Sequence, residues 1–272
     1  MNPLVSIIIT TKNSAKTLNE CLQSIKNQTY KNTELIVVDN NSTDQTKKLA
    51  RKYTSKIFNH GPERSAQRNF GAKQALGEYL LIHDSDIYFN INSVKECVEL
   101  SQENKCDAII LSEKSIGIGF WAKVKAYERS FYVGNDYIEA ARFFKKDFFE
   151  KLGGYDENLT GPEDWDLTIR IREAGHKILR TELFLEHDEG FVNLFGSSKK
   201  KKYYAKDVFE KYAQKHPKIF KSQMNFLKRF PPKKLTANFI KKPLLTISMF
   251  FMKICEFSFG KIEYLKFKFK KI

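Results

Sequence analysis

Two carboxylates stand one residue apart in the segment LLIHDSDIYF (residues 80–89), where Asp84 and Asp86 follow an apolar run. In an extended chain, side chains at positions i and i+2 project to the same side and lie about 7 Å apart, at a rise of ~3.3 Å per residue. Like charges at that separation repel each other unless a cation lies between or beside them. The pair therefore predicts a cationic partner.

Polar residues also stand at the ends of other apolar segments. The segment TTKN (residues 10–13) follows a β-branched run, Asp39 ends the segment ELIVVD, and Asp84 ends EYLLIHD. In an open α/β sheet, ligands bind at the carboxyl ends of the strands. We therefore expect these three polar clusters to line one rim of a sheet.

The elements that would position these residues alternate between strand and helix. Apolar segments predict strands over residues 4–11, 34–39, 55–59, 78–84, 106–111, 139–146 and 176–189. Helical spacing predicts helices over residues 18–27, 42–53, 63–76 and 162–175. Ser42 and Gln45 form a capping-box pattern at the second of these helices. The alternation predicts an α/β fold with a Rossmann-like, mostly parallel central sheet flanked by helices.

Acidic residues crowd the start of the helix predicted at residues 162–175. Glu163, Asp164 and Asp166 fall in its first turn, where the helix dipole favours negative charge. A second polar cluster, around His187, ends the last predicted strand. These two clusters add candidate functional groups to the rim.

Composition places the chain among globular proteins. With 42% hydrophobic and 29% charged residues among 272, it can form a core, which excludes an intrinsically disordered chain. The four cysteines show no CxxC pairing, so neither a disulfide framework nor a zinc site is expected, and a reducing compartment fits. The N-terminus enters an apolar strand without a basic region, which does not resemble a signal peptide.

Positive charge is concentrated in the last quarter of the chain. Residues 199–272 hold 21 Lys and Arg against 4 Asp and Glu, a net charge of +17, whereas residues 1–198 have a net charge of −2. The lysine run at 199–202 marks the predicted boundary between a catalytic domain (1–196) and a basic extension (197–272). Such a tail favours a polyanionic partner, either nucleic acid or an anionic membrane.

The extension also contains apolar residues. Its longest apolar run, residues 244–252, is far shorter than the ~20 residues that span a bilayer. Leu245, Met249, Met252 and Cys255 recur at near-helical spacing among phenylalanines and lysines. This pattern predicts an amphipathic helix that lies in the membrane interface, with lysines attracted to anionic lipid. The alternatives are a helix packed on the catalytic domain and a homodimer formed through these helices; nucleic-acid binding is not expected, because no such motif is present.

Five segments resemble family 2 glycosyltransferases of the GT-A fold. They are VSIIITTKN, ELIVVDNNSTDQT, RNFGAKQALGEYLLIHDSD, GGYDENLTGPEDWDLTIRIREAG and a later histidine, in the family's order over residues 4–190. The resemblance implies a UDP- or GDP-linked sugar donor, a divalent metal (Mn²⁺ or Mg²⁺) and inversion at the anomeric carbon. A hard cation of this kind prefers carboxylate oxygens, which would answer the question that Asp84 and Asp86 raise.

The resemblance also implies roles for individual residues. Asp86 matches the metal-binding aspartate, Asp84 the aspartate nearer the ribose and the metal, and His187 a histidine that completes metal or diphosphate binding. Asp39 matches the residue that binds the nucleobase. Arg68 would bind the diphosphate or hold an aspartate of the DSD cluster.

The remaining implied roles concern the rim and the acceptor. Thr11 and Asn13 would contact the base or ribose. Asp164 matches the general base, which deprotonates the acceptor hydroxyl as it attacks the anomeric carbon. Glu163 and Trp165 beside it would bind the acceptor or the sugar.

The sequence thus predicts an inverting glycosyltransferase, peripheral on the cytoplasmic face of the cell membrane, that acts on a lipid-linked glycan or another membrane-proximal acceptor. One alternative is a dolichyl- or polyprenyl-phosphate sugar transferase, whose phosphate acceptor needs no base; the PEDWD segment argues against it. The other is a non-catalytic sugar- or lipid-binding protein that retains the fold.

Overall fold

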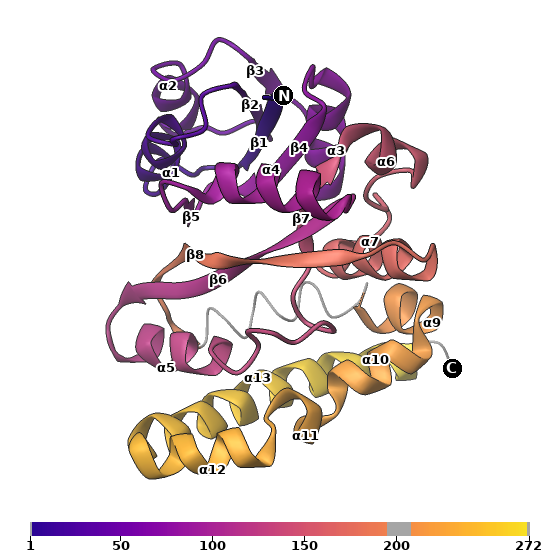
Figure 1. Ribbon diagram of the computed structural model, residues 1–272. Helices are drawn as coiled ribbons and strands as arrows, with labels where there is room; N and C mark the ends of the chain where they lie inside the picture. The colour runs from indigo at the N-terminus through magenta and orange to yellow at the C-terminus, as the bar shows by residue number, and fades with distance from the viewer. Residues whose placement is uncertain (1, 195–207, 271–272) are drawn as a thin grey trace. The chain divides into compact units, whose positions relative to one another are not determined.

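The computed structural model describes residues 2–194 and 208–270 (Figure 1). Its strands are β1 (Val5–Thr11), β2 (Thr33–Asp39), β3 (Ile57–Asn59), β4 (Tyr79–Asp84), β5 (Ile87–Tyr88), β6 (Ala108–Ile118), β7 (Ala141–Lys145) and β8 (Ile178–Phe191). Its helices before residue 195 are α1 (Leu18–Lys26), α2 (Thr46–Ala50), α3 (Arg64–Gln74), α4 (Ser93–Asn104), α5 (Phe120–Arg129), α6 (Lys146–Lys151) and α7 (Glu163–Glu173). Each strand and helix predicted from the sequence is present, with shifted ends.

The described residues divide into two compact units. The first contains the chain up to Glu113, together with Glu139–Asn158 and Glu163–Asp188. The second contains Lys114–Ile138, Leu159–Pro162 and the described residues from Glu189 onward. The predicted boundary at residues 196 and 197 lies outside the described residues.

One sheet in the order β3-β2-β1-β4-β7-β6-β8-β5 organises the fold. The first four strands pair in parallel, as the alternation of strand and helix predicts. The pairs β4–β7, β6–β7 and β5–β8 are antiparallel, so the sheet is mixed rather than mostly parallel. Strands β4 and β5, which are separated only by the turn at Ser85 and Asp86, are not neighbours in the sheet, because β5 pairs with β8 at its edge.

Strand β1 forms the centre of the core because all seven of its residues are buried. Ile7 and Ile9 pack with residues of α1 and α4 on one face, and Ile8 packs with residues of α3 and α7 on the other. Gly71 lets α3 approach the sheet closely, since a Cβ at this position would lie 2.5 Å from Cγ2 of Ile8. A sheet covered by helices on both faces produces the continuous apolar runs of the sequence.

The capping-box prediction at Ser42 was wrong. Helix α2 begins at Thr46, and the Ser42 hydroxyl donates instead to Oδ1 of Asp39 at 2.5 Å, while the Ser42 backbone N–H donates to Oδ2 at 2.7 Å. The backbone N–H of Thr46 donates to Asp44 at 2.9 Å. Ser42 therefore binds the Asp39 carboxylate at the end of β2 and does not cap a helix.

The second unit is helical around an apolar centre. After residue 207 it contains the π-helical turn η1 (Val208–Tyr212) and helices α9 (Ala213–Lys215), α10 (Pro217–Met224), α11 (Phe226–Arg229), α12 (Pro232–Lys241) and α13 (Pro243–Lys270). Val124 and Tyr127 of α5 pack with Phe230, Met249 and Met252. In the part of the chain that the structure describes, we find no helix with the length and apolarity needed to cross a membrane.

Candidate active site

The end of strand β1 connects two aspartates on opposite faces of the sheet. The Thr11 hydroxyl donates to Oδ1 of Asp39 at 2.8 Å, and the Thr10 hydroxyl donates to Oδ1 of Asp84 at 2.9 Å. Each threonine is the register partner of the aspartate that it contacts. Successive residues of a strand point to opposite faces, so the two pairs lie on the two sides of the rim. Thr10 was not predicted as a site residue.

Asp39 and Asn13 are joined through Ser42. Asp39 is fully buried, and its carboxylate accepts from Thr11 and Ser42. The backbone N–H of Asn13 donates to the Ser42 hydroxyl at 2.8 Å, and its side-chain oxygen accepts from the Thr43 N–H at 2.9 Å. Asn13 has a φ of 52° and is exposed at the surface. The structure therefore brings Thr11, Asn13 and Asp39 together as predicted, and their contacts to a nucleotide stay predictions.

The cation beside Asp84 is an arginine. Arg68, which is fully buried, donates from Nη2 to Asp84 at 2.8 Å and from Nη1 to Glu163 at 3.0 Å. Arg64 lies farther away, at 3.3 Å from Asp84 and 3.5 Å from Glu163. Removal from water raises the pKa of a carboxyl group, but Arg68 and Arg64 hold the pKa of Asp84 well below its usual range. Arg68 thus holds an aspartate of the DSD cluster, the second of its two predicted roles. A metal contact of Asp84 stays a prediction.

The two arginines should differ sharply in their contribution to stability. Arg68→Met is expected to lower the free energy of unfolding by about 3–5 kcal/mol, because it leaves the buried Glu163 carboxylate without its nearer cation. Arg64→Met is the matched control: this side chain is 35% exposed and its ion pairs are longer, so a loss below about 1 kcal/mol is expected. Urea unfolding followed by circular dichroism measures both. Equal losses would contradict the assignment of Arg68 as the internal cation.

Asp86 has a different environment from Asp84. Strand β4 ends at Asp84 and the chain turns at Ser85 and Asp86, so the prediction that both aspartates project from an extended chain was wrong. Oδ2 of Asp86 lies 3.7 Å from Nε2 of His187. Within residues 2–194 and 208–270, Oδ1 of Asp86 is buried and has no hydrogen-bond partner. A bound cation would satisfy a buried carboxylate oxygen that has no hydrogen-bond donor.

His187 is oriented by a residue that the sequence did not indicate. Its Nδ1 lies 2.8 Å from Oε2 of Glu113, on β6, while Nε2 faces Asp86. A histidine that binds a metal through one ring nitrogen usually contacts a carboxylate with the other. No signal in the segment around Glu113 distinguishes it from a surface acid, because its distance from His187 in the sequence is 74 residues.

The residues present fit a metal ion only if a bound substrate supplies some of its ligands. The described residues contain no group of three or more His, Cys, Asp or Glu side chains that could hold a metal. Asp86 and His187 would supply two ligands at most. Mg²⁺ commonly binds to one or two carboxylates and completes its coordination with substrate phosphates and water. The donor set therefore fits a metal that binds together with a diphosphate.

Asp164 lies in the first turn of α7 and is paired with an arginine from β7. Its Oδ2 accepts from Nη2 of Arg142 at 2.6 Å, and its Oδ1 accepts from the Trp165 backbone N–H at 2.8 Å. Thr168 ties the two elements together, because its hydroxyl accepts from the Ala141 N–H at 3.0 Å. Arg142 was not predicted as a site residue. The pair holds the Asp164 carboxylate in one orientation.

The other two residues predicted to bind the acceptor or sugar occupy different positions. Glu163 is 1% exposed and paired with Arg68, so its carboxylate is engaged inside the protein. Trp165 is half-buried on the same helix. Both roles therefore stay predictions. The structure places the predicted residues in four groups, around Asp39, Asp84, Asp86 and Asp164.

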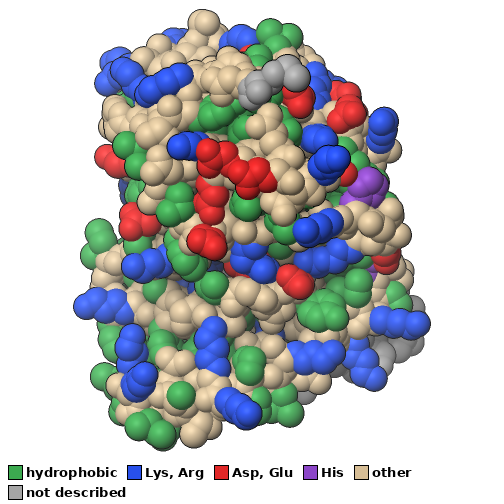
Figure 2. Space-filling model, in the orientation of Figure 1, with side chains coloured by type: hydrophobic (Ala, Val, Ile, Leu, Met, Phe, Trp, Pro, Cys, Tyr) green, Lys and Arg blue, Asp and Glu red, His purple; other side chains and the backbone are tan. Residues whose placement is uncertain are grey.

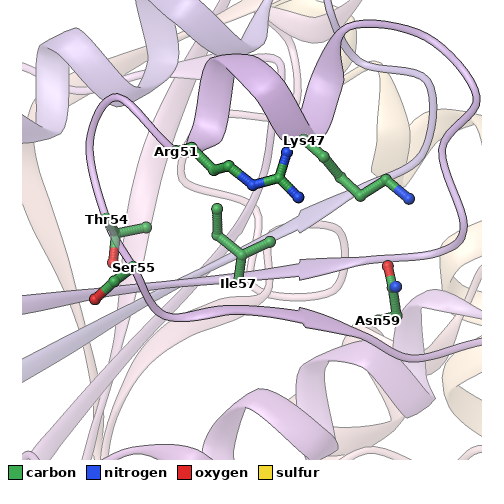
Figure 3. Close-up of a pocket in the computed structure, with 6 residues that line it drawn as sticks. All are labelled: Lys47, Arg51, Thr54, Ser55, Ile57 and Asn59. Carbon is green, nitrogen blue, oxygen red and sulfur yellow. The ribbon is translucent and has the colours of Figure 1, made fainter.

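A cavity of 480 Å³ lies at the edge of the sheet, beside β3. It is lined by Lys47, Arg51, Thr54, Ser55, Ile57 and Asn59. Figure 3 shows Arg51, which follows α2, lying over Ile57, and Lys47 of α2 extending toward the side of Asn59. None of its lining residues was predicted as a site residue, but Asn59 is the register partner of Asp39. The cavity therefore borders the strand end at which Asp39 lies.

Comparison with known proteins gives a family match and several relatives. Residues 6–160 match the family model of Glycosyl transferase family 2. An uncharacterized glycosyltransferase of Rickettsia typhi is 31% identical over 214 residues, which cover 71% of this chain and 67% of that protein. The poly(ribitol-phosphate) beta-N-acetylglucosaminyltransferase TarS of Staphylococcus aureus is 34% identical over 122 residues, which cover 41% of this chain and 21% of TarS.

Solved structures have a similar fold. The mannosyltransferase PcManGT from Pyrobaculum calidifontis, in complex with GDP-Man and Mn²⁺, superposes with a TM-score of 0.69 at 17% identity, over 100% of this chain and 89% of its own. Residues 1–349 of S. aureus TarS, in complex with UDP, superpose with a TM-score of 0.58 at 22% identity, over 88% of this chain and 75% of that one. At these identities the likeness concerns the fold alone.

Proposed function

This chain belongs to glycosyltransferase family 2 and has the GT-A fold, and from that premise we propose that it transfers a sugar from UDP or GDP to an acceptor hydroxyl, with inversion. The observation that supports this most directly is Oδ1 of Asp86, in the turn after β4, which is buried without a hydrogen-bond partner among the described residues, while His187 faces the same carboxylate. The complexes of TarS with UDP and of PcManGT with GDP-Man and Mn²⁺ support a nucleotide-sugar donor and a metal.

The donor would bind across the ends of β1, β2 and β4. Asp39 lies at the end of β2, where a carboxylate can accept from a ring N–H of the base. Thr11 and Asn13 are joined to it and would contact the base or ribose. Asp86 and His187 would hold a divalent metal with the diphosphate, and this metal would neutralise negative charge on the departing phosphate.

The acceptor would be activated by Asp164. In inverting transfer, one carboxylate removes the proton of the acceptor hydroxyl as the oxygen attacks the anomeric carbon. Arg142 and the Trp165 N–H each occupy one oxygen of Asp164, and each oxygen retains a second lone pair for the incoming hydroxyl. We assign the acceptor to the class of lipid-linked or other membrane-proximal glycans, and the protein to the cytoplasmic face of the membrane, because of the charge of +17 over residues 199–272.

The test of this function uses the full chain and a panel of UDP- and GDP-sugars with Mn²⁺. A bound donor should raise the melting temperature by mass action, for one base more than for the other. The same donor should be hydrolysed slowly, and transfer to an acceptor should give the inverted anomer by NMR. If no nucleotide sugar shifts the melting temperature or is hydrolysed, the chain is a non-catalytic member of the family.

Glu113 should affect metal affinity through His187. Glu113→Gln is expected to weaken Mn²⁺ binding in the presence of UDP by ~10–100-fold, because the carboxylate that orients the imidazole loses its charge. Glu186→Gln is the matched control, since this exposed carboxylate neighbours His187 on the same strand. Calorimetric titration of Mn²⁺ measures both variants. Unchanged affinity in Glu113→Gln would show that His187 does not bind the metal.

A further inference from the structure

Helix α13 has apolar residues on two faces. Met249 and Met252 are fully buried in the apolar centre that includes Val124 and Tyr127 of α5. The sequence assigned these two methionines, with Leu245 and Cys255, to a membrane-facing side. In the structure this face packs inside the protein, as the alternative of a packed helix predicts.

A second apolar face of α13 points outward. We call it the α13 stripe: Leu244, Ile247, Phe251 and Ile254, whose side chains are 65%, 59%, 52% and 64% exposed. Their spacing of three, four and three residues places them along one side of the helix. A helix that is apolar all round is normally covered all round, and no residue of the described ranges covers the stripe.

The orientation of α13 is fixed by buried charges. Lys253 and Glu256, 6% and 5% exposed, form ion pairs with Glu128 and Lys125 of α5. The Thr246 hydroxyl lies 2.5 Å from the Tyr127 hydroxyl, in a buried hydrogen bond. Rotating α13 to bury the stripe would leave these charges unpaired inside the protein, which is strongly unfavourable. The stripe therefore stays at the surface.

Charge around the stripe selects the occupant. The sequence from Asn225 to Met252 holds no acidic residue and six lysines and arginines. Lys233, Lys241 and Lys242 are exposed on α12 and at the start of α13. On the face that Figure 2 shows, the described residues of α11 and α12 are blue, green and tan, with no red among them. A second copy would place lysines against lysines, whereas anionic headgroups would complement them.

We infer that the α13 stripe docks on an anionic lipid bilayer, with its apolar side chains at the acyl boundary and the lysines on the headgroups. This inference rests on the membrane location assigned under the proposed function and is independent of the transfer chemistry. Attraction of lysines to anionic lipid weakens with salt, whereas burial of apolar side chains does not. Docking should therefore have a salt-sensitive part and a salt-resistant part.

The test is co-sedimentation of the full chain with vesicles of phosphatidylglycerol and phosphatidylcholine, and of phosphatidylcholine alone, at low and high salt. We expect binding to the anionic vesicles that persists in part at high salt. Ile247→Gln/Ile254→Gln should weaken it by ~10-fold or more. Leu76→Gln/Ile91→Gln is the matched control, because these exposed side chains lie outside the second unit. Circular dichroism establishes that each variant is folded.

Two results would overturn the inference. One is that Ile247→Gln/Ile254→Gln binds anionic vesicles as strongly as the wild type does. The stripe would then have no role in docking. The other is a dimer of the full chain in lipid-free light scattering that the stripe variant converts to a monomer, which would make a second copy the occupant. Nucleotide-sugar binding, measured by thermal shift on the same samples, reports separately on the proposed function.

Discussion

Replacing Asp86 by alanine is expected to lower metal-dependent sugar transfer by about 10³-fold, the equivalent of several kcal/mol of lost charge stabilisation. The same variant should be at least as stable as the wild type in EDTA. This second expectation follows because Oδ1 of Asp86 is buried without a hydrogen-bond partner among the described residues, and such an atom destabilises the metal-free protein. Transfer assays and urea unfolding in EDTA measure the two effects.

The control variant for this experiment is Asp147→Ala, which removes a carboxylate that is 73% exposed on α6. It should leave transfer and its dependence on Mn²⁺ unchanged. Mn²⁺ with UDP should raise the melting temperature of the wild type and of this control, and should have little effect on Asp86→Ala. Full transfer by Asp86→Ala in EDTA would end the metal hypothesis. A large loss of stability in that variant would show that the Asp86 carboxylate has a structural partner.

The sequence was sufficient for the parallel half of the sheet and for the rim. Strands buried on both faces have continuous apolar residues, and a polar residue where such a strand ends is conspicuous. Thr11, Asp39 and Asp84 were found in this way, and the structure joins them through β1. The antiparallel half was not predicted, because strand pairing beyond β4 depends on turns and long-range order that local patterns do not contain.

Glu113 and Arg142 show why part of the site was missed. Each lies on a strand of the antiparallel half, and each contacts a predicted residue that is distant in sequence, Glu113 by 74 residues and Arg142 by 22. The sheet order brings Glu113 on β6 to His187 on β8, and the packing of α7 on β7 brings Asp164 to Arg142. The spacing argument for Asp84 and Asp86 failed for a local reason: the chain turns directly after Asp84, so the two-residue repeat of a strand no longer applies.

The C-terminal helix illustrates a further limit. Periodicity in the sequence identified an apolar face at Met249 and Met252, but it could not separate a face that contacts protein from one that contacts lipid. The buried pairs of Lys253 and Glu256 with α5 decide this, because they fix which side of α13 points inward. Lys253 and Glu256, which follow the apolar run of residues 244–252, thus form internal ion pairs.

Replacing Asp164 by asparagine is expected to lower kcat by ~10²–10⁴-fold while donor affinity stays within about twofold of the wild type. Asparagine has the same shape and can still accept from Arg142, so the loss isolates the ability to take a proton. Asp166→Asn is the matched control: this acid is two residues away on α7, is fully buried and contacts Arg170 at 2.8 Å. Calorimetry measures donor affinity, and turnover is measured at saturating acceptor.

The split between kcat and donor affinity separates a base from a binding residue. Lower kcat with normal donor affinity is the result expected for a lost base. Lower donor affinity with normal kcat would instead make Asp164 a binding residue. If kcat and donor affinity both survive, Asp164 does not act as a base. The acceptor oxygen would then be ionised already, as in a polyprenyl phosphate, and transfer to a phosphate rather than to a hydroxyl would be the activity of this chain.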